Sequence, residues 1–172
     1  MLFRSREDVN DSVDKIILES IDLDKYDCII FSDYCKGFLS IDDIKYITLN
    51  KKSNCITFID TKKIFSNFID HIDFIKINTD EFKNNTTYLK TCTKPYNLIV
   101  TEGDRGATLY THNSQEYFST TKVVLRDVCG AGDTFLAALA IQYLKTFNIH
   151  QSISFANYCA SKVVSQFGVV TI

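Results

Sequence analysis

The stretch Asp27-Cys-Ile-Ile-Phe-Ser32 decides the fold class of this chain. A continuous apolar run of this length, bounded by polar residues and followed by a loop that contains Gly37, is typical of a central strand in a parallel sheet. Both faces of such a strand are covered by helices. We therefore expect an α/β domain built around residues 27–32.

Further strands and helices alternate along the rest of the chain, which indicates a mostly parallel sheet whose ligands gather at the carboxyl ends of strands. Ser40 is expected to cap a helix that has Asp42 and Asp43 in its first turn. A long loop is expected over residues 85–96, around the only proline, Pro95. The other expected strands are 55–59, 72–77, 96–101 and 169–172, with a hairpin over 107–111 and 116–119, and the expected helices are 9–21, 40–50, 64–69, 79–84, 131–147 and 150–167.

The composition is that of one globular domain. The chain has 172 residues, of which 45% are hydrophobic and 23% charged, so it can bury a core and has no compositional reason to be disordered. The net charge of -2, without a basic stretch interleaved with aromatics, argues against nucleic-acid binding. The chain also lacks an apolar run of membrane length, so we expect neither a signal peptide nor membrane association, and a cytoplasmic location.

The six cysteines are scattered without a C-x-x-C pair. We expect reduced thiols, because the core is large enough without disulfides and a zinc site would need paired ligand spacing.

The segment Gly130-Ala-Gly-Asp133 carries the candidate chemistry, because it immediately precedes a strongly helical run that begins at Thr134. Glycines at a helix start let backbone N–H groups converge on an anion, which the helix dipole also favours. Asp133 in the first turn could accept a proton from an attacking hydroxyl. The same residues would equally suit a tight loop and a helix cap with no ligand, and spacing alone leaves both interpretations open.

The sequence resembles the ribokinase (PfkB) family of carbohydrate kinases. Asp127-Val-Cys-Gly-Ala-Gly-Asp-Thr-Phe135 is similar to the family signature D-T-x-G-A-G-D-x-F. Asn78-Thr-Asp-Glu81 is similar to its N-x-x-E element, and Thr101-Glu-Gly-Asp-Arg-Gly106 to its T-x-G-x-x-G element. The resemblance implies a three-layer α/β/α sandwich with a mostly parallel sheet, truncated at its N-terminus. Residues 1–172 would then form the C-terminal, nucleotide-binding portion of a single kinase domain.

The resemblance also implies roles for individual residues. Asp133 would be the catalytic base, and Gly130, Ala131 and Gly132 the anion hole. Glu81 would hold Mg²⁺ through water, and Asn157 would lie near the adenine of ATP. The residues implied to bind the nucleotide and its metal are Asn78, Glu81, Thr101, Gly103, Gly106, Asp127 and Asn157.

Within this family the chain is most similar to the kinases that phosphorylate heptose 7-phosphate. Ser32-Asp-Tyr-Cys-Lys-Gly37 resembles their S-D-Y-G-K-G, Ile59-Asp-Thr-Lys62 their I-D-P-K, and Phe155-Ala-Asn157 begins a similar terminal segment. The resemblance implies a heptose 7-phosphate acceptor, bound by Asp33, Lys36, Lys62 and Asp133. A lysine ammonium suits phosphate contact, although spacing alone would also fit solvated lysines for Lys36 and Lys62.

Four positions depart from the family pattern. Cys129 stands where the family usually has threonine, Cys35 replaces a glycine, and Thr61 and Ile77 replace prolines. We expect the fold to tolerate each change, although a cysteine at position 35 would be strained if the backbone there needs a positive φ.

The family's N-terminal half, which supplies most sugar contacts and a β lid, has no counterpart in these residues. We therefore expect weak phosphorylation by the chain alone, since catalysis needs an enclosed, oriented acceptor. A second copy or a complementing chain is an expected partner. Two alternatives remain open at this point: a nucleotide-binding remnant without activity, and an oligomeric scaffold that associates through an exposed sheet edge.

Overall fold

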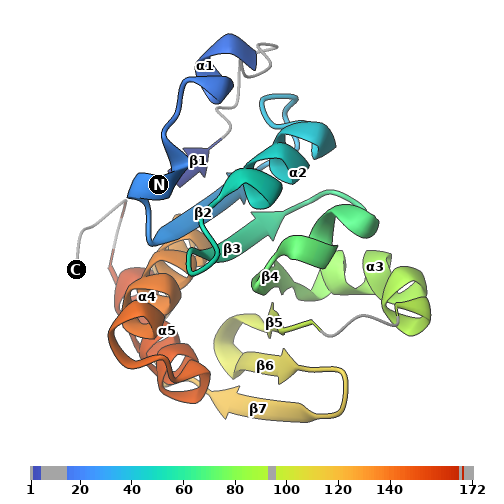
Figure 1. Ribbon diagram of the computed structural model, residues 1–172. Helices are drawn as coiled ribbons and strands as arrows, with labels where there is room; N and C mark the ends of the chain where they lie inside the picture. Colours follow the sequence, from blue (N-terminus) through green and yellow to red (C-terminus); the bar gives the residue numbers. More distant parts are fainter. Residues whose placement is uncertain (1, 5–14, 93–95, 167, 169–172) are drawn as a thin grey trace. The chain divides into compact units, whose positions relative to one another are not determined.

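The computed structural model describes residues 2–4, 15–92, 96–166 and 168 (Figure 1). The chain divides into two compact units, residues 1–98 and 99–172, and each unit is described by itself. The single domain expected over residues 1–172 stays a prediction.

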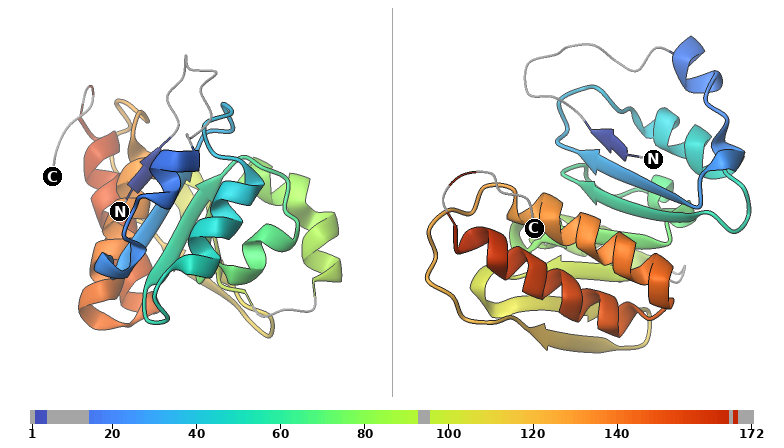
Figure 2. Two further views of the ribbon diagram at one scale, coloured as in Figure 1. Left: turned by 45° about the horizontal axis from the view of Figure 1, so that its top comes forward. Right: turned by 90° about the vertical axis from the view of Figure 1, so that its left-hand side faces the viewer.

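The first unit is a parallel sheet with its strands in sequence order, β1-β2-β3-β4. The connections after β2 and after β3 contain α2 and η2, which pack against each other (Figure 2). Its elements are β1 (Leu2–Arg4), α1 (Lys15–Glu19), the 3₁₀ turn η1 (Leu23–Lys25), β2 (Cys28–Asp33), α2 (Ile41–Asn50), β3 (Ile56–Thr61), the 3₁₀ turn η2 (Asn67–His71), β4 (Phe74–Asn78) and α3 (Thr79–Thr91).

The apolar run that predicted a central strand forms β2. Ile29 and Phe31 point to the same face of β2 and have no exposed surface, whereas Cys28 and Ile30 on the other face are partly buried. Phe58 of β3 is also fully buried and stacks on Phe74 of β4, with 5.0 Å between ring centroids. Burial of aromatic and β-branched side chains along these strands is the main stabilising contribution in this unit.

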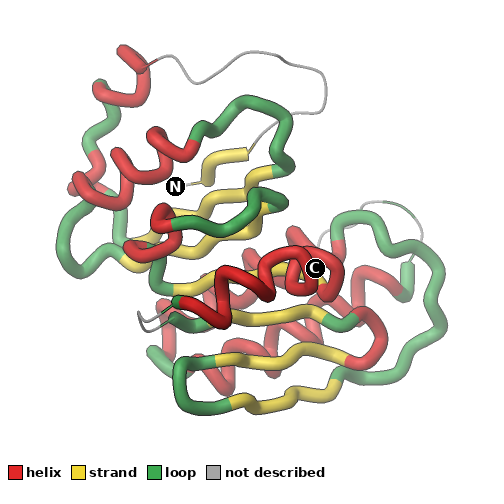
Figure 3. The backbone as a smooth tube through the Cα atoms, turned by 90° about the vertical axis from the view of Figure 1, so that its right-hand side faces the viewer, coloured by secondary structure: helices red, strands yellow, loops and turns green. Residues whose placement is uncertain are grey.

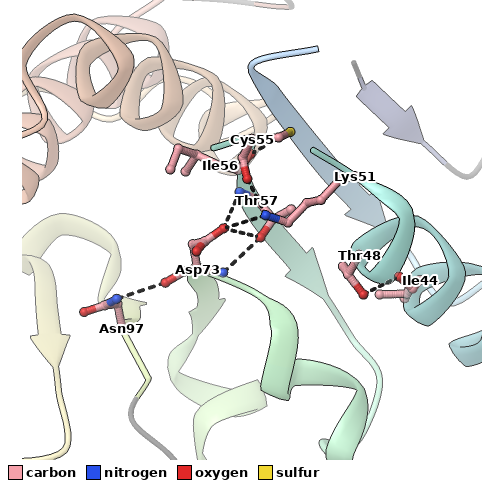
Figure 4. Close-up of polar contacts among 8 residues, drawn as sticks. All are labelled: Ile44, Thr48, Lys51, Cys55, Ile56, Thr57, Asp73 and Asn97. Atoms are coloured by element: carbon pink, nitrogen blue, oxygen red, sulfur yellow. Dashed lines mark hydrogen bonds and ion pairs between the residues drawn. The ribbon is translucent and has the colours of Figure 1, made fainter. Parts of the chain in front are cut away.

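A polar cluster joins the amino ends of β3 and β4 (Figure 4). Asp73 Oδ2 accepts hydrogen bonds from the Thr57 N at 2.8 Å and the Thr57 Oγ1 at 2.7 Å, and lies 3.8 Å from Lys51 Nζ. The Asp73 carbonyl accepts a hydrogen bond from Asn97 Nδ2 at 3.0 Å. These contacts connect the end of α2 to two strand starts, so this edge of the sheet is occupied by a structural network.

The second unit contains a hairpin and two long helices. β6 (Gly106–Tyr110) and β7 (Gln115–Ser119) pair antiparallel, as the sequence predicts. Helices α4 (Ala131–Thr146) and α5 (Ile149–Val164) lie side by side, joined at Phe147, which has a φ of 50° (Figure 2). β5 (Leu98–Thr101) and the 3₁₀ turn η3 (Gly103–Arg105) come before the hairpin. Figure 3 shows the strands in yellow and the helices in red.

None of the helices in the described part of the chain has both the length and the apolar character needed to span a bilayer.

Several boundaries differ from those predicted from sequence. The helix expected over 79–84 continues to Thr91, so most of the expected 85–96 loop is helical. The reason is Asn85, which is buried inside the helix because its Oδ1 accepts from the Phe65 N at 2.6 Å and its Nδ2 donates to the Glu81 carbonyl at 2.8 Å.

Three further differences lie in short elements. The helix expected over 64–69 is the 3₁₀ turn η2, and β1, which pairs with β2, was not predicted because three residues show no periodicity. The helix expected over 9–21 is confirmed only for Lys15–Glu19, since residues 5–14 lie outside the described residues. The final strand expected over 169–172 also lies outside them.

Candidate functional site

The carboxyl ends of β2, β3 and β4 form one part of the candidate site. Strand register places Asp33 beside Thr61, and Asp60 beside Lys76. Lys76 Nζ lies 2.6 Å from Asp60 Oδ2, and both side chains are largely buried. Ligands of open parallel sheets bind at this edge, so the register gathers charged side chains where a ligand is expected.

Asp33 lies at the centre of a buried hydrogen-bond network. Its Oδ2 accepts from Thr61 Oγ1 at 2.8 Å and lies 2.6 Å from Lys63 Nζ, and its Oδ1 accepts from the Cys35 N at 3.0 Å. The Asp33 side chain has no exposed surface. The sequence pointed to Asp33 as a substrate ligand, and the structure places its carboxylate among these three protein donors.

The two lysines expected to contact substrate both lie at exposed positions. Lys36 is on the loop after β2, and Lys62 follows β3. Lys62 Nζ lies over the ring of Tyr34, 5.4 Å from its centroid, which is within the range of a cation–π contact. The contacts of Tyr34 and Lys63 could not be predicted from the sequence, since no spacing rule relates the loops that follow two separate strands.

The Asn78-x-x-Glu81 element is a helix capping box at the start of α3. Asn78 Oδ1 accepts from the backbone N of Asp80 and of Glu81, both at 2.9 Å, and Glu81 Oε2 accepts from the Asn78 N at 2.8 Å. The spacing of a cap residue and a glutamate three positions later is a known signal for this arrangement, and it could have been read from the sequence. Asn78 and Glu81 therefore stabilise the start of α3, whether or not they also bind a ligand.

Glu81 also lies in a charged environment. Burial raises the pKa of its carboxyl, and Asp60 acts in the same direction, whereas the Asn78 backbone hydrogen bond and the nearby charges of Lys76 and Lys62 lower it. The cause that dominates is loss of hydration. Glu81 thus shares its surroundings with the Asp60–Lys76 pair and with Lys62.

The donor set in the first unit fits a magnesium ion held mainly through water. Asn78 Oδ1 already accepts two backbone hydrogen bonds, which leaves the Glu81 carboxylate as the anionic group of the motif. Among the described residues, no group of three or more His, Cys, Asp or Glu side chains could hold a metal directly. Mg²⁺ commonly keeps several waters and binds one or two carboxylates together with substrate phosphates.

In the second unit, Thr101 to Gly106 form a tight turn between β5 and β6. The Glu102 N donates to the Gly106 carbonyl at 2.8 Å, and the Glu102 carboxylate accepts from Thr108 Oγ1 at 2.5 Å. Gly106 has a φ of 119°, and a Cβ there would lie 2.1 Å from the carbonyl oxygen of Phe118. Glycine is therefore required at position 106 for the hairpin to close, independently of any nucleotide.

Asp127 fastens the glycine loop to the end of α5. Its Oδ1 accepts from the Cys129 N at 2.8 Å, and its Oδ2 accepts from the Gly168 N at 3.2 Å. The Asp127 N also donates to the Val164 carbonyl at 3.3 Å. The side chain thus fixes the conformation of the loop, which is how it would support a nucleotide site.

The loop turns into α4 at Gly130, which has a φ of 76° and provides no side-chain cap. The Ala131 N donates to the Val128 carbonyl at 3.2 Å, and regular helical bonding begins with the Thr134 N and the Gly130 carbonyl at 2.9 Å. Asp133 stands in the first turn. A helix that begins without a side-chain cap directs amide donors and the positive end of its dipole outward, which suits an anion.

Asn157 of α5 holds the end of β7. It is 5% exposed, and its Nδ2 donates to the Phe118 carbonyl at 3.0 Å, while its own carbonyl accepts from Thr120 Oγ1 at 3.2 Å. The structure therefore gives this residue a packing role between α5 and the hairpin. The expected site residues fall into two groups, one in each unit.

The family of this chain follows from a comparison with known sequences. Residues 41–172 match the family described as pfkB family carbohydrate kinase. The chain belongs to this family. It is similar to the bifunctional protein HldE of Sulfurimonas denitrificans, with 28% identity over 185 residues, which cover 98% of this chain and 39% of that protein.

Solved structures show that this pfkB family chain has a ribokinase-like α/β fold, which confirms the expected class. A ribokinase from Thermotoga maritima matches with a TM-score of 0.72 and 23% identity over 90% of this chain and 56% of that one. A ribokinase from Arabidopsis thaliana complexed with ribose and ATP matches with a TM-score of 0.72 and 19% identity over 91% and 55%. The chain thus spans about half of the ribokinases and 39% of the curated relative.

The departure from the pfkB family pattern at Cys35 has a structural consequence. Cys35 has a φ of 59°, in the left-handed region where a Cβ is unfavourable. We expect Cys35→Gly to stabilise the protein by about 0.5 kcal/mol, because relief of about 1 kcal/mol of strain is partly offset by the greater unfolded-state entropy of glycine. Urea unfolding measures the change. Cys35→Ser, which keeps the Cβ, should show no gain, and a gain equal to that of glycine would contradict this explanation.

Proposed function

We propose that the chain takes part in ATP-dependent phosphorylation of a hydroxyl group on a sugar or sugar phosphate. The observation that carries this proposal is the start of α4, where Gly130 turns the backbone into a helix without a side-chain cap and Asp133 occupies the first turn. An anion site and a carboxylate on the same helical turn are the two elements that phosphoryl transfer requires from a protein.

In this proposal, Asp133 accepts the proton of the acceptor hydroxyl as that oxygen attacks the γ-phosphorus of ATP. A bond forms between the acceptor oxygen and phosphorus, the bond to the β-phosphate oxygen breaks, and ADP leaves with the electron pair. The amides of Gly130, Ala131 and Gly132 stabilise the negative charge that develops on the transferring group. Positioning and charge stabilisation account for most of the rate in such reactions.

The residues proposed to bind ATP and its metal have different roles. Glu81, at the start of α3 beside Asn78, would hold Mg²⁺ through water, and the ion would supply charge neutralisation at the nucleotide phosphates. Asp127 fixes the glycine loop, while Thr101, Gly103 and Gly106 border ATP and Asn157 lies near its adenine. Asn78, Glu81, Asp127 and Asn157 also make structural hydrogen bonds, which support a defined local geometry for this proposal.

The acceptor that we propose is heptose 7-phosphate, phosphorylated at its anomeric hydroxyl. The support is the similarity to the bifunctional protein HldE together with the Ser32–Gly37 segment. Lys36 and Lys62 are exposed at the carboxyl end of the parallel strands, where they can approach a phosphate. We also propose a cytoplasmic location and association with a second copy or a complementing chain.

Two measurements test the proposed function. Calorimetry should detect binding of ATP in the presence of Mg²⁺, and release of ADP should depend on heptose 7-phosphate more than on ribose or fructose 6-phosphate. Binding of ATP without ADP release with any acceptor would favour a nucleotide-binding remnant. No heat of ATP binding would contradict both, and light scattering would then test the scaffold alternative.

A further inference from the structure

Two adjacent lysines follow β3 and have different surroundings. Lys63 turns inward, with its Nζ 2.6 Å from Asp33 Oδ2, and its side chain is 12% exposed. Lys62 is exposed, and its Nζ lies over the ring of Tyr34. The charge of Lys63 is therefore neutralised inside the protein, whereas that of Lys62 is presented at the surface on a neutral aromatic ring.

The contacts of Asp33 join the loop after β2 to the loop after β3. Its carboxylate accepts hydrogen bonds from Cys35 on the loop after β2, from Thr61 at the end of β3 and from Lys63 on the loop after β3. Its carbonyl also accepts from the backbone N of Lys62 at 3.4 Å. Contact between Asp33 and a sugar would require the buried carboxylate to give up hydrogen bonds from three donors, which costs free energy. Its contacts therefore favour a role in holding the two loops together over a role as a sugar ligand.

Two other lysines lie at this edge: Lys76 is buried, and Lys36 is exposed on the loop after β2. Lys76 lies against Asp60 at 2.6 Å, so its ammonium is neutralised in the same way as that of Lys63. Lys62 lies over an uncharged ring, and its positive charge also acts on Glu81. An external phosphate that approaches this edge would therefore meet Lys62 as a positive charge without a paired carboxylate in the described contacts.

We infer that Asp33 is a positioning residue that acts with Lys63 and Thr61, and that the loops it clamps present Lys62, supported by Tyr34, to a phosphate group. The inference rests on the proposed function and deepens it. The phosphate belongs either to the nucleotide or to the acceptor sugar. Asp33 thus has an indirect role, in place of the direct substrate contact that was expected from the sequence.

The first test separates the two lysines. Lys62→Met should weaken binding of a phosphate ligand by about tenfold, since a charged hydrogen bond is lost, and should leave Tm within about 2 °C of wild type. Lys63→Met should lower Tm by about 10 °C, because Asp33 is left buried and unpaired. Lys62→Arg, which keeps the positive charge, should bind the phosphate ligand more tightly than Lys62→Met.

The second test separates positioning from mere structural support. Asp33→Ala/Lys63→Met removes both buried charges together, so it should recover much of the Tm that Lys63→Met loses. Its phosphate affinity, measured well below Tm, should stay as low as that of Lys62→Met because the loops are no longer clamped. Recovery of affinity together with Tm would overturn the positioning role.

Calorimetry with two probes identifies the source of the phosphate. Loss of affinity for ATP with Mg²⁺ in Lys62→Met would assign the contact to the nucleotide, and loss of affinity for heptose 7-phosphate would assign it to the acceptor. Unchanged affinity for both probes would overturn the role of Lys62 while leaving the proposed function intact. If wild-type protein binds neither probe, both the inference and the proposed function are overturned.

Discussion

Asp133→Asn is expected to lower sugar-dependent ADP release by roughly 10²- to 10⁴-fold, the usual contribution of a positioned general base. The amide keeps the size of the side chain in the first turn of α4 but cannot accept the proton of the acceptor hydroxyl. Affinity for ATP with Mg²⁺ should be unchanged or tighter, because a negative charge near the phosphates has been removed. A coupled assay for ADP measures the first effect and calorimetry the second.

Asp42→Asn is the matched control for this experiment. Asp42 is also an acidic residue in the first turn of a helix, α2, and it is exposed. Its turnover should stay within about twofold of wild type, since an exposed residue away from special features changes stability little. Equal turnover in wild type and Asp133→Asn would refute the assignment of the base.

Gly106→Ala is expected to destabilise the protein by roughly 4 kcal/mol. Two effects add: a φ of 119° that side chains rarely adopt, and a Cβ that would lie 2.1 Å from the Phe118 carbonyl oxygen and 2.9 Å from the Thr120 N. Both neighbours are backbone atoms of the partner segment, so the hairpin must open to make room. Urea unfolding followed by circular dichroism gives the free-energy difference.

Gly103→Ala tests which of the two effects is larger. Gly103 lies in the same turn with a φ of 65°, and no atom lies within 4 Å of the Cβ position. We expect a loss of about 1 kcal/mol from backbone strain alone. Equal losses for the two variants would show that strain, and not the approach of β7, makes Gly106 necessary.

The strand and helix pattern was predictable because periodicity and caps are local properties. The run at 27–32 predicted β2, and Ser40 caps α2 as expected, with its Oγ accepting from the Asp43 N at 3.0 Å. The α3 boundary was not predictable, because it depends on Asn85 contacting Phe65, which is 20 positions away. The Asn78–Glu81 capping box was local and could have been found.

The candidate site shows the same division. Motif order was sufficient to indicate the pfkB family, and the glycine loop at Gly130 forms the helix start that its residues predict. Roles within a motif were harder to assign. Asn157 and Gly106 match family positions, yet both have structural roles at the hairpin: Asn157 donates to the Phe118 carbonyl, and the space beside Gly106 is too small for a Cβ because that carbonyl is so near.

The sequence by itself determined the fold class, the order of the elements and the family, because each follows from residues close together along the chain. The tertiary structure alone decided which of two neighbouring lysines is neutralised and which faces solvent. Strand register brings Lys63 to Asp33, which is 30 positions away in the sequence, and Lys62 lies over the ring of Tyr34. Electrostatic environment depends on such distant neighbours, and composition and spacing do not specify them.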